Sequence, residues 1–416
     1  MMNTRSKLEE EAVAQVKAKR PPVLVPLEFK HSQLTGTPWI ALGFALRGAV
    51  TIISATGGTG KTQFTLQAAI AFALGEEFAG FRPMRKDLKI AFVSGEEPLD
   101  EIWRRIAAIE IDRVGYKAAD IEKFKERLKG RLFICQGKNV AMVTKGTGKS
   151  DVAQRTPFHE ELCEAIIDLG IDLVILDPLI RLHAGLDENS AEMQELHNAA
   201  DDIATRGNCG VVLVSHTNKM SKGTVDDQNA ARGTSAMTDA ARVVIIMANM
   251  TETQAEDILP EAEQATYMRY CRLGDPKQSY TVNSGSQWFR KKTIKLPVTL
   301  EDGTDDYRFI LEPWKQPSND ILTAEWLPRF LDRLKQGRSD GEAFTAATSG
   351  PKPPRADVLL QNEFHQTKKH SKAALGQLVR AGILGVVERY SSKGKKPVKV
   401  YEVLKGAQAE ADDQLL

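Results

Sequence analysis

The chain has 416 residues, and its 56 Lys and Arg nearly balance its 55 Asp and Glu, so the formal net charge is +1. This balance excludes a whole-chain electrostatic attraction to nucleic acid or to a membrane surface, and the length allows about two to three domains. Because there is no run of about 18 apolar residues and no apolar signal region at the N-terminus, we expect a cytoplasmic protein with no membrane partner.

The four cysteines are spread along the chain. They form no C-x-x-C pair, and we see no His at metal-ligand spacing from them. The sequence therefore predicts buried free thiols in a reducing compartment, with neither zinc nor a disulfide. The cysteines are Cys135, Cys163, Cys209 and Cys271.

Residues 1–37 predict a charged helix followed by a proline-containing arm. Between about 48 and 250, short apolar runs alternate with longer helical patterns. Near-continuous apolar strands separated by helices are typical of a parallel sheet covered on both faces, so the predicted fold class is α/β with a mainly parallel central sheet. The predicted strands are 49–55, 88–95, 131–136, 171–177, 209–216 and 242–249, and the predicted helices include 62–75 and 158–170.

The second half of the chain changes in pattern. Residues 266–312 alternate apolar and polar residues between turn signals, which predicts hairpins that extend the sheet and complete a domain over 38–315. A proline-containing break separates this domain from a segment at 321–405. Residues 406–416 form an acidic tail that we expect to be disordered.

Two stretches resemble a phosphate-binding loop, "ATGGTGKT" at 55–62 and "KGTGKS" at 145–150. Such a loop needs a buried strand before it and a helix after it, because its glycines turn backbone N–H groups toward phosphate oxygens and the helix presents its N-terminus. The first stretch has both, and departs from the G-x-x-x-x-G-K-[ST] pattern only at Ala55. The second follows a short apolar run and is followed by Pro157, so we expect an exposed turn there.

The first loop predicts binding of ATP with Mg²⁺. Lys61 would reach the β and γ phosphates, and the Thr62 hydroxyl would hold Mg²⁺ together with Asp177. Asp177 ends the apolar run "IDLVILD", which is the form of a Walker B strand. The predicted nucleotide-binding residues are Ala55, Thr56, Gly57, Gly58, Thr59, Gly60, Lys61, Thr62 and Gln63.

Two further strand ends carry candidate catalytic groups. Glu96 and Glu97 follow the strand at 88–95, where open α/β sheets place their ligands, so one of them is a candidate for positioning the attacking water. Solvated acids at a helix start are the alternative interpretation. His216 ends the strand at 209–216 and is a candidate sensor of the γ phosphate, with a structural histidine as the alternative.

The order of these motifs resembles the RecA-fold ATPases of the plasmid RepA type, which are ring-shaped hexameric replicative DNA helicases. The similarity covers about 38–300 and includes "ATGGTGKT", "VSGEEP", "LVILDPLIRLH", "VVLVSHTNK" and "AARGTSAMTDAARVV". The resemblance implies that Glu96 is the catalytic glutamate and that His216 is the sensor. It implies that Arg242 is the arginine finger for the neighbouring subunit's ATP, with Arg232 as the reserve choice.

The same resemblance implies the partners. It predicts a homo-oligomer, expected to be a hexameric ring, with single-stranded DNA in its pore. The basic residues Lys219 and Lys222, in the polar loop after His216, would contact the phosphates of that strand.

The segment at 321–405 reads as helix, helix and two strands, which resembles a small winged-helix α+β domain. Between 367 and 399 it carries nine Lys and Arg against the single acid Glu388, so we expect salt-sensitive binding of DNA, with duplex DNA as the partner. A domain for protein contacts is the alternative. The predicted DNA contacts are Lys368, Lys369, Lys372, Lys393, Lys395 and Lys396.

The leading hypothesis is an ATP-dependent DNA helicase or translocase that acts on single-stranded DNA during replication of a plasmid, phage or mobile element. The alternative is an ATP-gated DNA-binding regulator or initiator that uses the winged helix and is not a motor.

Overall fold

The computed structural model divides the chain into two units, residues 1–38 and 39–416. The first unit contributes the short 3-10 helix η1 (His31–Gln33), and everything described below belongs to the second. The described residues are 30–136, 139–146, 153–186, 192–216, 225, 235–259, 261–281, 285–316, 324–339, 341–346, 355–366, 368–391 and 395–404.

A nine-stranded sheet organises the second unit, in the order β15-β14-β13-β12-β3-β11-β9-β5-β6. The six strands from β12 to β6 run parallel, and each lies within two residues of a strand predicted from the sequence. The prediction of a mainly parallel α/β core is therefore confirmed. These strands are β3 (Ala49–Ala55), β5 (Ile90–Ser94), β6 (Leu132–Gln136), β9 (Leu173–Asp177), β11 (Gly210–His216) and β12 (Val243–Asn249).

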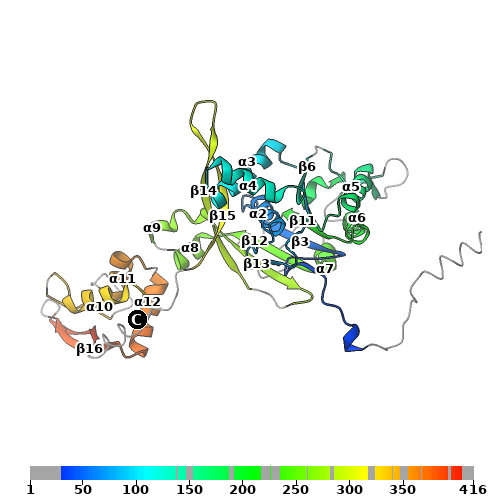
Figure 1. Ribbon diagram of the computed structural model, residues 1–416. Coiled ribbons are helices and arrows are strands. Elements are labelled where there is room, and N and C mark those ends of the chain that lie inside the picture. Colours follow the sequence, from blue (N-terminus) through cyan, green and yellow to red (C-terminus); the bar gives the residue numbers. More distant parts are fainter. Residues whose placement is uncertain are drawn as a thin grey trace, which may run out of the picture. The chain divides into compact units, whose positions relative to one another are not determined.

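Helices cover both faces of the parallel strands (Figure 1). Side chains alternate along each strand, so Ile53 of β3 joins the core beneath one helical layer while Ile52 joins the core beneath the other. The first layer contains α2 (Lys61–Ala73), α3 (Leu99–Val114) and α4 (Ala118–Leu128), and the second contains α5 (Pro157–Leu169) and α6 (Glu192–Arg206).

Antiparallel strands extend the sheet beyond β12, as the alternating pattern at 266–312 predicts. The last two pack against the first helical layer, because Phe289, Ile294 and Leu311 join the same core as α2 and α3. The elements of this region are α7 (Ser235–Ala240), α8 (Glu252–Ile258), α9 (Glu261–Gln264), η4 (Tyr267–Arg269), β13 (Tyr270–Gln278), β14 (Gln287–Thr299) and β15 (Asp305–Trp314).

The second "GTGK" stretch lies in a different context from the first. Residues 147–152 are outside the described part of the chain, but they connect two antiparallel strands of a small sheet. Pro157 is the first residue of α5, where a missing N–H costs nothing, so the helix predicted at 158–170 begins there and not directly after the stretch at 145–150. The strands are β7 (Val143–Lys145), β8 (Ala153–Arg155) and β10 (His183–Ala184), and η2 (Leu179–Arg181) lies between β9 and β10.

A small sheet near the N-terminus of the second unit was not foreseen from the sequence. It has three strands in the order β2-β1-β4, and two of them precede β3 in the chain. Its strands are β1 (Trp39–Leu42), β2 (Ala45–Leu46) and β4 (Arg82–Pro83).

The C-terminal segment has its own hydrophobic cluster, which includes Phe330, Leu360, Leu378 and Leu384. It contains the predicted helix, helix and pair of strands, preceded by one more helix. These elements are α10 (Leu327–Gln336), α11 (Ala356–Phe364), α12 (Lys368–Arg380), β16 (Leu384–Ser391) and β17 (Lys396–Val403). Among the described residues, no helix is both long and apolar enough to cross a membrane.

Candidate functional site

The polar residues predicted to act together follow parallel strands that end at one edge of the sheet. Asp177 of β9 is paired in register with Ser94 of β5, and His216 of β11 is paired with Ala55 of β3. The carboxyl ends of parallel strands are where open α/β sheets bind their ligands. The register therefore brings the phosphate loop, the Walker B candidate and the sensor candidate to the same edge.

The loop at 55–62 has the geometry that its glycines predict. Gly58 has φ +73°, and Gly60 has φ +102° and is the N-cap of α2. A Cβ at Gly60 would lie 3.1 Å from the Phe309 ring, so both the backbone conformation and the close contact require glycine there. The loop leads directly from β3 into α2, whose N-terminus faces the sheet edge.

Lys61 and His216 meet at this edge. The Lys61 Nζ lies 3.0 Å from the Nε2 atom of His216 and 3.3 Å from its Nδ1 atom. Burial lowers the pKa of the Lys61 ammonium, and the carboxylates of Asp177, Glu96 and Glu97 act in the opposite direction. The two side chains can therefore contact the same phosphate group.

Asp177 is buried with both carboxylate oxygens lacking a hydrogen-bond partner among the described residues. Burial raises the pKa of this carboxyl to about 6, while the nearby Thr62 hydroxyl and the Lys61 ammonium lower it. Thr62 is close enough to affect the pKa, although its geometry does not satisfy either oxygen. A buried, unsatisfied carboxylate beside a hydroxyl fits Mg²⁺, which prefers oxygen ligands and retains waters.

The two glutamates after β5 differ in their contacts. Glu97 binds Arg105 through both carboxylate oxygens, at 2.6 and 2.7 Å. Glu96 is exposed, and no hydrogen bond or ion pair of its carboxylate is found within the described ranges. Its position two residues beyond the end of β5 leaves it available to position a water, so Glu96 stays the predicted catalytic glutamate.

Arg242 lies at the opposite edge of the sheet from the loop. Its backbone N–H donates to the Val50 carbonyl at 3.2 Å, at the start of β3, and its side chain is exposed. The five residue-to-residue steps from Val50 to Ala55 span about 16 Å of strand. The Arg242 guanidinium therefore cannot reach the phosphate loop of its own chain.

Several predicted site residues fall outside the part of the chain that is described. They are Lys219, Lys222, Arg232 and Lys393, together with the side chains of Lys368 and Lys369. Of the other predicted DNA contacts, Lys372, Lys395 and Lys396 are exposed.

A family model described as an AAA domain matches residues 15–222. The match spans half of the 416 residues and includes the phosphate loop, Glu96, Asp177 and His216. The chain belongs to the AAA_25 family of AAA domains. It is thus a P-loop ATPase, in agreement with the parallel sheet and the loop geometry.

Among solved structures, one similar to this AAA domain protein is the KaiC-like protein PH0186 from the archaeon Pyrococcus horikoshii OT3. The two are 14% identical, and the match covers 69% of this chain and 100% of that chain with a TM-score of 0.36.

Lys291 of β14 contacts the phosphate loop, which the sequence did not reveal. Its Nζ donates to the Gly58 carbonyl at 2.8 Å and to the Met268 carbonyl at 3.1 Å, and lies 3.4 Å from the Asn249 side-chain oxygen. Burial lowers the pKa of this ammonium. Lys291 thus fixes the phosphate loop to the antiparallel strands. Sequence spacing gave no signal, because Gly58 and Lys291 are 233 positions apart.

A second set of contacts joins the end of β5 to β15. Arg105, which binds Glu97, also lies 3.8 Å from the Glu101 carboxylate. Glu101 accepts two hydrogen bonds of 2.7 Å from Arg308 of β15. The i, i+4 spacing of Glu101 and Arg105 could have predicted their contact from the sequence. No spacing indicates the contact of Glu101 with Arg308.

A cavity of about 500 Å³ lies between α3, α4 and β6, with Trp103, Glu110 and Phe124 in its wall. None of the phosphate-loop residues lines it, so it is separate from the nucleotide site.

We predict that Asp177→Asn stabilises the nucleotide-free protein while removing ATP hydrolysis. A pKa about two units above that of a free Asp carboxyl means that ionised Asp177 costs the folded state about 3 kcal/mol at pH 7.5. The amide removes this cost, so the free energy of unfolding should rise. The gain should shrink as the pH falls through 6 toward 4, because the wild-type carboxyl then protonates in the folded state. Urea unfolding in EDTA at several pH values measures it.

Asp172→Asn is the matched control for that experiment. Asp172 is also buried, but its carboxylate pairs with Arg47 and Arg85 and accepts a hydrogen bond of 3.0 Å from the Lys89 N–H. Removing its charge should lower the free energy of unfolding. If both variants are destabilised alike, Asp177 is not an unsatisfied carboxylate.

We predict that Lys291→Ala weakens ATP binding at least about fivefold, because a lost hydrogen bond to the loop backbone costs about 1 kcal/mol. Lys295→Ala is the control on the same strand, since Lys295 is half-exposed and pairs with Asp305 at 2.7 Å. Calorimetric titration with Mg²⁺ and ATP compares them. An unchanged dissociation constant in Lys291→Ala would show that the loop does not depend on this contact.

Proposed function

We propose that this AAA domain protein is an ATP-driven DNA helicase or translocase of the plasmid RepA type. The observation that carries the proposal is the distribution of its polar residues over the two edges of the sheet. Lys61, Asp177 and His216 gather at one edge, and Arg242 lies at the other. A complete site for hydrolysis then needs two copies of the chain.

At the first edge, each residue has a distinct task. Lys61 and His216 bind the terminal phosphate, and Glu96 orients the attacking water. Thr62 and Asp177 would hold Mg²⁺, which would supply positive charge beside the phosphate oxygens. The bidentate pair of Glu97 with Arg105 fixes the segment that carries Glu96.

Arg242 supplies the contribution of the neighbouring subunit. Its guanidinium is too far from its own phosphate loop and is exposed, so it is available to another copy. A repeated head-to-tail contact of this kind forms a ring when its rotation closes, and the resemblance to the RepA type favours a closed hexamer. An arginine acting in trans couples hydrolysis in one subunit to the position of the next.

DNA would be contacted by two parts of the chain. The basic loop after His216, with Lys219 and Lys222, is the proposed contact to single-stranded DNA in the pore. The C-terminal segment is proposed to be a winged helix that binds duplex DNA. Its support is the order α11, α12, β16 and β17 together with the exposed Lys372, Lys395 and Lys396.

We predict ATP hydrolysis that single-stranded DNA stimulates, with strand separation, and loss of both in Lys61→Ala and Glu96→Gln. Steady-state ATPase assays and an unwinding assay measure these activities. The Glu97→Gln variant is the comparison, because Glu97 acts on the site through Arg105 and should retain more activity than Glu96→Gln. Hydrolysis that is indifferent to single-stranded DNA, with duplex binding intact, would favour the ATP-gated regulator instead.

We predict that mixing two inactive variants restores hydrolysis. Lys61→Ala lacks a working loop but keeps Arg242, and Arg242→Ala lacks the finger but keeps the loop. Each alone should lose about 10³-fold or more in rate. A mixed oligomer contains interfaces that join an intact loop to an intact finger, so activity should return in proportion to such interfaces. Co-assembly without any recovery would contradict action in trans.

A further inference from the structure

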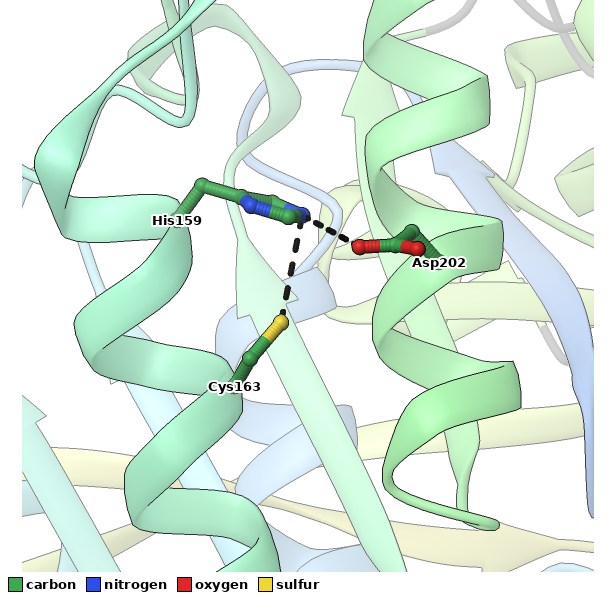
Figure 2. Close-up of side chains that lie close together, drawn as sticks. All are labelled: His159, Cys163 and Asp202. Atoms are coloured by element: carbon green, nitrogen blue, oxygen red, sulfur yellow. Dashed lines mark hydrogen bonds and ion pairs between the residues drawn. The ribbon is translucent and has the colours of Figure 1, made fainter. Parts of the chain in front are cut away.

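Helices α5 and α6 bring three side chains with metal-binding atoms together. Figure 2 shows His159 and Cys163 on one helix, with Asp202 pointing toward them from the neighbouring helix. His159 and Cys163 are four residues apart, so they project from the same face of α5. The sequence expectation that no His lies at metal-ligand spacing from a cysteine is therefore wrong.

The separations of the three ligand atoms fit a tetrahedral ion. All three lie within 4.8 Å of one another, with His159 Nε2 3.9 Å from Cys163 Sγ and 3.5 Å from Asp202 Oδ2. Zinc bonds of about 2.0–2.3 Å at tetrahedral angles separate neighbouring ligand atoms by about 3.3–3.8 Å. The two distances from His159 therefore lie within a few tenths of an ångström of the tetrahedral range, and the Cys163–Asp202 pair, which lies within 4.8 Å, would close by up to about 1 Å.

The surroundings of the cluster suit a bound cation. His159 and Cys163 are each 1% exposed, whereas the Asp202 side chain is 27% exposed. The aspartate side therefore offers a path of entry, and the two buried ligands are shielded from competing water. A divalent ion with one thiolate and one carboxylate has no net charge, which limits the cost of burying it.

The arginines near Asp202 do not depend on it alone. Arg155 and Arg206 contact the Oδ2 atom at 2.9 and 3.3 Å. Arg155 also donates to Glu195 at 3.1 Å, and Arg206 also donates to Glu160 at 2.8 Å. Each arginine thus keeps a second carboxylate partner when Asp202 binds a metal ion. Each can also hold the ligating carboxylate of Asp202 in place.

We propose that His159, Cys163 and Asp202 bind a divalent transition-metal ion of the zinc class, which links α5 to α6. Binding displaces the thiol proton of Cys163 to solvent, places the His159 ring proton on Nδ1, and replaces the hydrogen bond of 3.2 Å from His159 Nε2 to the Ala199 carbonyl. Three protein ligands leave a fourth position for water. Because α5 precedes β9 and α6 follows it, the ion stabilises the two helices on either side of the Asp177 strand in the chain.

The test uses the full chain, stripped with a chelator and then titrated with Co²⁺ in place of Zn²⁺. The proposal predicts a thiolate-to-cobalt charge-transfer band that saturates at about one equivalent per chain. The band should be absent in Cys163→Ser and remain in Cys271→Ala, which removes a buried thiol from β13. Zn²⁺ should displace the cobalt and raise the melting temperature of the wild type.

Asp202→Asn provides a second variant at a partly exposed position. It should weaken cobalt binding at least about tenfold, because an amide is a poorer ligand than a carboxylate. A wild-type protein without the charge-transfer band would overturn the proposal. So would the same band and affinity in Cys163→Ser, or an unchanged affinity in Asp202→Asn.

Discussion

The buried carboxylate of Asp177 is the constraint on which the site depends. A charged group without hydrogen-bond partners is costly inside a protein, and here the cost falls where β9 ends at the ligand-binding edge of the sheet. A divalent cation bound by Thr62 and Asp177 would offset this cost. The AAA domain therefore carries a carboxylate whose environment favours the metal-bound state over the empty one.

The antiparallel strands brace the phosphate loop against this edge. Phe309 packs on Gly60, and Lys291 holds the Gly58 carbonyl. The Gln67 side chain exchanges hydrogen bonds of 2.8 and 3.0 Å with the Leu311 backbone, which ties α2 to β15. The strands beyond β12 thus contact the phosphate loop and α2, although they lie outside the residues that the AAA domain model matches. Any movement of β14 and β15 would displace the phosphate loop.

Local patterns were sufficient for the parallel core. Runs such as "AVTIISA" and "CGVVLVSH" are mostly apolar because both faces of the strand are buried, so their limits are visible in the sequence. The first "GTGK" stretch was chosen as the phosphate loop because a helix directly follows it. The second stretch lies between the antiparallel strands β7 and β8, in agreement with this choice. What the sequence could not show are contacts between distant segments. Lys291 with Gly58 and Arg308 with Glu101 depend on how the hairpin packs, and no spacing rule encodes that.

The metal cluster shows a different limit. His159 and Cys163 have a readable spacing, but their third partner comes from another helix, so the pair gains meaning only when α5 and α6 are packed together. The exposed position of Arg242 also gains meaning only from the fold, because the fold places it at the end of the sheet opposite the phosphate loop.

Asp177 is expected to hold the Mg²⁺ that accompanies ATP, and the dependence of ATP affinity on Mg²⁺ is the decisive measurement. Calorimetric titration of the wild type with ATP, in Mg²⁺ and in EDTA, should show much tighter binding with the metal. In Asp177→Asn the two affinities should become similar. Equal affinities in the wild type, or an unchanged dependence on Mg²⁺ in the variant, would contradict the account.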